Sequence, residues 1–159
     1  MRRVMPGTNI APLPPDEIQR FLKEHLAYRL ALIRDAIPRV PAQSLADDQA
    51  FEAAAVAGRV ILDFLGIGYD QKREYLKAER THRCVNGLTD DVKVIDLGGH
   101  YVDLAELNEE EAATLTRFIH GVHKACAHLT ASKHGLDVAT FQAAAPLIQR
   151  LYEKHIQSA

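Results

Sequence analysis

The sequence predicts a mainly α-helical protein, a bundle of four to five helices with a small β-hairpin near residues 92–104. Apolar residues recur at helical spacing in several long segments, and near 92–104 they fall instead at alternate positions beside a glycine pair. The chain has 159 residues, of which 47% are hydrophobic and 25% charged. This is enough for one domain with its own core. We expect residues 1–14 to form an extended N-terminal arm and residues 15–159 a single helical domain.

Proline, glycine and capping residues delimit the first two helices. Asp16 is expected to cap a first helix that stops before Pro38. A second helix is expected from Ser44 to Leu65, where Gly66 ends it. This second helix is apolar around most of its circumference, so we expect it to lie buried among its neighbours.

The second half of the chain contains further predicted elements. Residues 70–80 have the length and composition of a short third helix. Residues 92–104 form the predicted hairpin, turned on Gly98 and Gly99. Helices are then expected over 109–129 and about 138–156.

Bulk properties exclude several classes of protein. The net charge of −2 gives no overall basic field, so a nucleic-acid site would need a local patch. No apolar run reaches the length of about 18–20 residues that a membrane span needs, and the N-terminus lacks the apolar segment of a secretion signal. Cys84 and Cys126 lie far apart without metal-ligand spacing. We therefore expect a cytoplasmic protein that binds no membrane, metal or cofactor.

The strongest indication of function is a polar stripe on the helix expected over 109–129. Turned at about 100° per residue, this helix carries an apolar face on one side. On the other side Arg117, His120, Lys124 and His128 fall within an arc of about 80°.

Imidazoles and cations on one face suit the metal-independent cleavage of RNA. One histidine would take the proton of a 2′-hydroxyl and another would protonate the leaving oxygen, while the cations stabilise the developing charge. We take His128, His123 and His120 as candidate catalytic residues, and Lys124 and Arg117 as candidate substrate-binding residues. His120 and His123 also have a spacing that could share a metal ion, but residues 117–130 contain no Asp or Glu to accompany them.

Two further candidates lie on the first helix. His25 and Arg29 project from the middle of its apolar face. A buried arginine needs a partner, for which we expect Asp63 or a backbone carbonyl at a helix end. A functional interpretation places both residues in a polar cleft with the 109–129 helix, and the alternative is an arginine extended to the rim of the bundle.

The segment HKACAHLT at 123–130 resembles the motif helix of HEPN-type domains, which are small helical bundles of prokaryotic defence and toxin systems. Their hallmark is an arginine followed after four to six residues by a histidine, often within Ala-His. The resemblance implies a metal-independent ribonuclease in which the motif helices of two subunits meet, with His128 as the motif histidine. His123 stands at the usual arginine position, and family members with a degenerate motif are thought to bind or scaffold rather than cleave.

Three interpretations remain open. The first is a HEPN-like homodimer that binds or cleaves RNA, in a defence or toxin–antitoxin system. The second is a non-catalytic helical interaction module of the same fold that binds a protein partner. The third is a helical bundle that binds a small ligand, with Arg29 and His25 lining an apolar pocket between helices.

Overall fold

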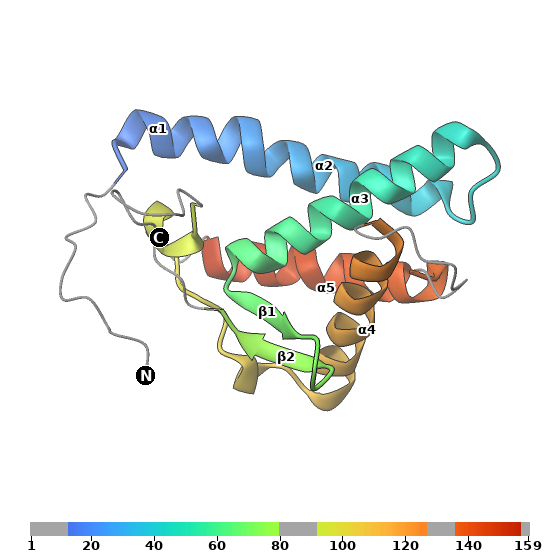
Figure 1. Ribbon diagram of the computed structural model, residues 1–159. Coiled ribbons are helices and arrows are strands. Elements are labelled where there is room, and N and C mark those ends of the chain that lie inside the picture. Colours follow the sequence, from blue (N-terminus) through green and yellow to red (C-terminus); the bar gives the residue numbers. More distant parts are fainter. Residues whose placement is uncertain (1–12, 80–91, 127–135, 157–159) are drawn as a thin grey trace.

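Four helices and one two-stranded antiparallel sheet build the part of the protein that the computed structural model describes, residues 13–79, 92–126 and 136–156 (Figure 1). The predicted class, a helical bundle with a small β-hairpin, is confirmed. None of the described helices is long and apolar enough to cross a membrane. Nearly all of the predicted N-terminal arm lies outside the described residues.

The first helix is continuous over three segments. It comprises α1 (Pro15–Arg20), a π-helical stretch (Phe21–Leu26) and α2 (Ala27–Ala36). The predicted capping role of Asp16 is wrong, because the helix begins at Pro15. Proline at the first helical position is favoured, since the N–H that it lacks would have no partner there.

The second helix, α3 (Leu45–Phe64), begins as predicted. The Ser44 hydroxyl oxygen accepts a hydrogen bond from the backbone N–H of Asp47 at 3.2 Å and so caps the helix. The chain leaves α3 through Gly66, whose φ of +83° is in the left-handed region that favours glycine.

The β-hairpin lies at 67–78, so its predicted position near 92–104 is wrong, as is the predicted third helix over 70–80. Strands β1 (Ile67–Asp70) and β2 (Tyr75–Ala78) pair antiparallel, with Tyr69 opposite Leu76. The carboxylate of Asp70 begins the turn by accepting hydrogen bonds from the backbone N–H groups of Lys72 and Arg73. This turn chemistry, and packing against the helices, outweigh the helical propensity of the charged residues.

The segment 92–104 instead forms short 3₁₀ turns. One spans Val94–Leu97 and the other Leu104–Glu106. Gly98 ends the first turn with a φ of +85°. Gly99 lies against the end of the last helix, where a Cβ atom would be 2.4 Å from the carbonyl oxygen of His155. Gly98 and Gly99 therefore do not turn a hairpin. They end a 3₁₀ turn and allow the chain to pack closely against α5.

The last two helices agree with the prediction over their described lengths. Helix α4 (Glu109–Cys126) has a reciprocal cap, in which Asn108 and Glu111 each accept from the backbone N–H of the other at 2.9 and 3.1 Å. Asp137 accepts from the Thr140 backbone N–H at 2.8 Å and starts α5 (Val138–Ile156). The predicted extension of α4 to 129 falls outside the described residues.

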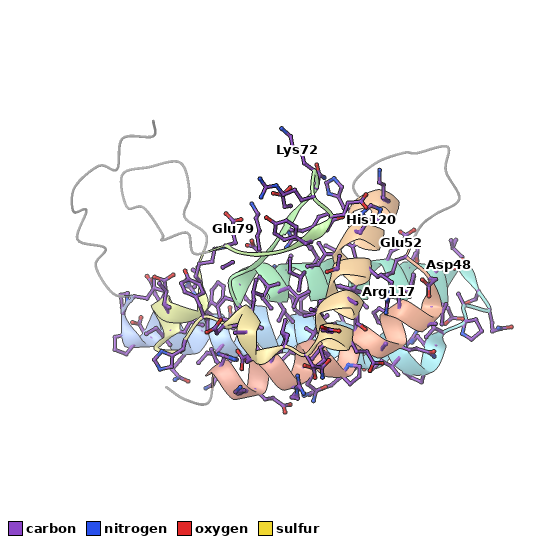
Figure 2. The ribbon with its side chains drawn as sticks, turned by 90° about the horizontal axis from the view of Figure 1, so that it is seen from below. Asp48, Glu52, Lys72, Glu79, Arg117 and His120 are labelled. Atoms are coloured by element: carbon purple, nitrogen blue, oxygen red, sulfur yellow. The ribbon has the colours of Figure 1, made fainter. Side chains whose placement is uncertain are left out.

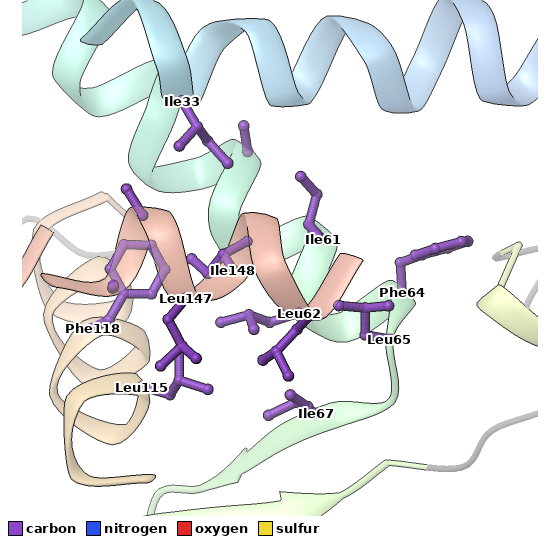
Figure 3. Packing of buried hydrophobic residues seen from close by; sticks show 14 of the residues in the cluster. Ile33, Ile61, Leu62, Phe64, Leu65, Ile67, Leu115, Phe118, Leu147 and Ile148 are labelled. Atoms are coloured by element: carbon purple, nitrogen blue, oxygen red, sulfur yellow. The ribbon is translucent and has the colours of Figure 1, made fainter. Parts of the chain in front are cut away.

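The core lies where α3 meets α4 and α5 (Figure 3). Phe118 of α4 is fully buried beside α3. A Cβ atom at Gly58 would lie 2.8 Å from the ring of Phe118 and 3.2 Å from Ile148 of α5. The missing side chain at position 58 therefore permits the close approach of three helices.

A buried ion pair joins the end of α3 to the segment after residue 91. The Lys93 side chain is 4% exposed, and its ammonium donates to the Asp63 carboxylate at 2.5 Å and to the Asp63 carbonyl at 3.3 Å. Asp63 is 39% exposed. The carboxylate thus compensates a charge that has almost no contact with water.

A second ionic cluster fixes the end of α5. His155 Nδ1 lies 3.0 Å from the His100 carbonyl oxygen, and Nε2 lies 2.8 Å from the Glu106 carboxylate. Lys154 also pairs with Glu106. Burial raises the pKa of Glu106, but the hydrogen bond from Lys154 and the charges of His155 and Lys154 outweigh it and hold that pKa below its ordinary value.

This cluster predicts a loss of stability in acid. A carboxyl whose pKa is lower in the folded state stabilises the fold above its unfolded pKa of about 4.3, and this contribution disappears as the pH falls through the folded value. We expect Glu106→Gln to lower the free energy of unfolding at pH 7 by about 2 kcal/mol and to flatten its decline in acid. Denaturant unfolding from pH 7 to 2 measures both effects. Glu24→Gln, at an exposed site, is the control, and an equal acid slope in Glu106→Gln and wild type would contradict the assignment.

Candidate functional site

A pocket between the β-hairpin and α4 collects the chemically active side chains. It has a volume of about 290 Å³. The hairpin and α4 contact each other directly, and Figure 2 shows His120 close to the hairpin end that carries Lys72. The residues that line the pocket, drawn from both elements, are Tyr69, Gln71, Glu74, His120, His123 and Lys124.

The centre of the pocket is a hydrogen bond between Tyr69 and His120. The hydroxyl oxygen of Tyr69 lies 2.7 Å from His120 Nδ1, and the two rings meet edge to face with their centroids 5.9 Å apart. Burial, helped by the negative charges of Glu74 and Asp70, raises the pKa of Tyr69. The phenol therefore stays protonated at neutral pH and can donate to Nδ1.

This arrangement leaves the other nitrogen of His120 for a ligand. When the phenol donates to Nδ1, the ring proton resides on Nε2. Nε2 makes no hydrogen bond with another described residue. His120 is thus held by Tyr69 on one side and presents a proton donor on the other.

The neighbouring positions of α4 complete the pocket. His123 Nε2 contacts the side-chain amide of Gln71 from the hairpin turn. Lys124 also lines the pocket, half-buried and without an ion pair to a described residue. The lining of the pocket therefore includes two imidazoles and one ammonium group beside the carboxylate of Glu74.

The hairpin turn sets the position of its side chains through its backbone. Glu74 closes the turn with a φ of +54°, in the left-handed region, and its N–H donates to the Asp70 carbonyl at 2.8 Å. The turn also carries Lys72 and Arg73, both exposed. The two cations of the turn are thus accompanied by the carboxylates of Asp70 and Glu74, and Glu74 lines the pocket.

Three of the predicted site residues lie together in this pocket. His120, His123 and Lys124 all line it. Arg117 does not, because its side chain is exposed and its guanidinium donates to the Thr114 hydroxyl at 3.4 Å. His128 lies outside the described residues.

The two candidates on the first helix lie elsewhere. His25 is exposed, and its ring contacts Phe21 at a centroid distance of 5.0 Å. Arg29 donates to the His25 carbonyl oxygen at 3.0 Å. Its expected partner, Asp63, pairs instead with Lys93, and the carbonyl that Arg29 does reach lies within the helix and not at its end. Neither His25 nor Arg29 lines the pocket of His120.

Sequence reasoning missed the hairpin residues of the site. Tyr69, Gln71 and Glu74 were not candidates, because 70–80 was expected to be helical. The alternation of Ile67 and Tyr69 directly after Gly66 is a strand pattern that would have placed a phenol near the histidines.

The described residues contain no group of three or more His, Cys, Asp or Glu side chains placed to hold a metal ion. The side chains that line the pocket supply proton donors, proton acceptors and a cation. No family model matches the chain, and no curated protein or solved structure is significantly similar to it.

Proposed function

We propose that the pocket between the hairpin and α4 binds a phosphodiester of RNA and that His120 and His123 exchange protons with it. The observation that carries this proposal is the convergence of His120, His123 and Lys124 with Tyr69 in one pocket. A phosphate needs cationic and N–H donors, and an adjacent 2′-hydroxyl needs a base.

The proposed reaction is a transesterification within the RNA. One imidazole takes the proton of the 2′-hydroxyl, the 2′-oxygen forms a bond to phosphorus, and the bond from phosphorus to the 5′-oxygen breaks. The other imidazole protonates that leaving oxygen. Lys124 stabilises the charge on the phosphoryl oxygens, and Tyr69 orients His120. The products are a 2′,3′-cyclic phosphate and a 5′-hydroxyl.

The size and lining of the pocket are compatible with this ligand. Its volume of about 290 Å³ is at the lower end for a small-molecule site and fits one phosphate with its sugar better than a whole base. Glu74 would repel a phosphate placed beside it, so we assign its carboxylate to a ribose hydroxyl, which can donate to it.

The resemblance of residues 123–130 to the HEPN motif helix supports RNA as the substrate, but it implies His128, and not His120, as the motif histidine. It extends the proposal to a role in a defence or toxin–antitoxin system inside the cell. The proposed chemistry uses side chains of one copy of the chain and does not require two facing 117–130 helices. A homodimer in which the 117–130 helices of two subunits meet remains a prediction. A protein partner, which the interpretation as a non-catalytic interaction module requires, remains a prediction as well.

RNA cleavage in EDTA tests the proposal. We expect the full chain to cleave single-stranded RNA and to leave 2′,3′-cyclic phosphate ends. His120→Ala should lower the rate by about 10²- to 10⁴-fold, and Tyr69→Phe should have a smaller effect because it keeps the ring. His100→Ala, which removes an exposed imidazole outside the pocket, should leave the rate unchanged.

Two further measurements separate the alternatives. If no RNA is cleaved, binding measured by fluorescence anisotropy should still weaken in Lys124→Ala and fall with added salt. Cleavage that is lost in His128→Ala but intact in His120→Ala would contradict the role of His120 and assign the chemistry to the motif histidine. A folded protein that neither cleaves nor binds RNA would overturn the proposal.

A further inference from the structure

A second surface of the protein is a groove along the outer side of α2 and α3, separate from the pocket of His120. Its volume is about 580 Å³, twice that of the pocket of His120. The side chains that line it come from α2 and α3 only, and they are Tyr28, Arg29, Leu32, Gln49, Glu52, Ala53, Val56, Ala57 and Val60.

Several large apolar side chains of the groove are exposed to solvent. Tyr28 is 60% exposed, Val56 46% and Val60 40%. Contiguous exposed apolar side chains with a polar rim mark sites of protein association. The small residues Ala53 and Ala57 on the floor would let another helix approach closely.

Two opposite charges stand on the two sides of this groove. Arg29 comes from α2 and Glu52 from α3. Arg29 uses one N–H group for the His25 carbonyl of its own helix, and Glu52 has no ion pair or hydrogen bond with a described residue. The groove thus carries a cation and an anion that do not pair with each other.

Such a surface is complementary to itself. A twofold axis through the middle of the groove exchanges its two sides, so it brings Arg29 of one copy opposite Glu52 of the other, and the reverse. The apolar side chains of α2 in one copy would then face those of α3 in the other. Each ion pair would form twice in the assembly.

We propose that a second copy of this chain packs on the α2–α3 groove around a twofold axis. The lining of the groove on α3 runs from Gln49 to Val60, about 18 Å along the helix, and two adjacent helices together are about 20 Å wide. This area of about 360 Å² is below the 800 Å² per partner that is usual for a specific interface, so we expect a weak dimer. The proposal is independent of the RNA chemistry assigned to the pocket of His120.

Charge reversal tests this assembly, with the mass of the full chain measured by sedimentation equilibrium. We expect a dimer in wild type and a Kd raised by about 100-fold or more in Arg29→Glu and in Glu52→Arg, because each reversal places like charges opposite each other twice. The double variant should recover the dimer. A mixture of the two single variants should form the heterodimer, since all facing charges are then opposite.

Lys23→Glu is the matched control, because Lys23 is exposed on the same helix but does not line the groove. It should leave the dimer unchanged, and thermal unfolding should show that all variants are folded. A wild-type chain that stays monomeric at about 100 µM, where weak specific dimers are populated, overturns the proposal. A dimer that neither single reversal weakens overturns it as well, since another face then forms the interface.

Discussion

Asp63→Ala is expected to lower the free energy of unfolding by about 3 kcal/mol, because it leaves the Lys93 ammonium buried without its carboxylate. The Lys93 side chain is 4% exposed, and its remaining partner would be a backbone carbonyl at 3.3 Å. Breaking a buried pair from one side costs more than the pair itself contributes. Urea denaturation followed by circular dichroism measures the change.

The converse substitution separates desolvation of the lysine from loss of the pair. Lys93→Met keeps most of the aliphatic volume and leaves Asp63, which is 39% exposed, free to be solvated. We expect it to cost about 1 kcal/mol or less, clearly below Asp63→Ala. Equal losses in the two variants would show that loss of the pair itself, and not the buried ammonium left behind in Asp63→Ala, determines the effect.

Phe118→Ala is expected to lower the free energy of unfolding by about 3–5 kcal/mol, since it removes a fully buried ring from the junction of three helices. Gly58→Ala should cost about 1–3 kcal/mol for the opposite reason, because its Cβ would lie 2.8 Å from the same ring. Chemical denaturation of both variants gives these values.

A double-variant cycle tests whether the two effects arise from one contact. In a Phe118→Leu background the space beside position 58 changes, so Gly58→Ala should cost much less than in wild type. Additive effects would show that the penalty at Gly58 comes from another neighbour, such as Ile148, whose Cδ1 would lie 3.2 Å away.

The helices could be predicted because their signals are local. Ser44 and Asn108 cap α3 and α4 as their side-chain chemistry requires, and Gly66 ends the region of α3. A capping hydroxyl or amide acts on N–H groups two or three residues away, so the sequence contains the whole cause. The prediction that Asp16 caps the first helix failed because Pro15, one residue earlier, is an equally local start signal.

The hairpin could not be placed from propensity. Lys72, Arg73 and Glu74 favour a helix, yet Glu74 adopts a left-handed φ without being glycine. The valines and glycines after residue 91 favour a hairpin, yet Gly99 is required by the carbonyl of His155 in α5. In the second segment a contact with a distant helix decides the conformation, and a window of neighbouring residues does not contain that contact. In the hairpin, the turn at Asp70 and the strand pattern at 67–69 are local signals that compete with the helical propensity of the residues after them.

Only the α4 side of the candidate site could be predicted, because helical spacing is a local signal and the position of the hairpin is not. Helical spacing places His120 and Lys124 on one face, and both line the pocket. Arg117 has the same phase but lies about two turns earlier than Lys124 and turns to Thr114. Periodicity fixes the direction of a side chain around the helix, and only the tertiary fold determines how far along the helix the hairpin reaches.

The pocket joins segments that are distant in the chain, since Tyr69 and His120 are 51 residues apart and Gln71 and His123 are 52 apart. The hairpin and α4 form the two walls of the pocket. Bringing them together closes a long loop of chain, and the entropy lost in closing this loop must be offset by their contacts. A partly folded chain can therefore possess α4 and its histidines without possessing the site. Any opening that separates the small hairpin from α4 abolishes the pocket while the core around Phe118 stays closed.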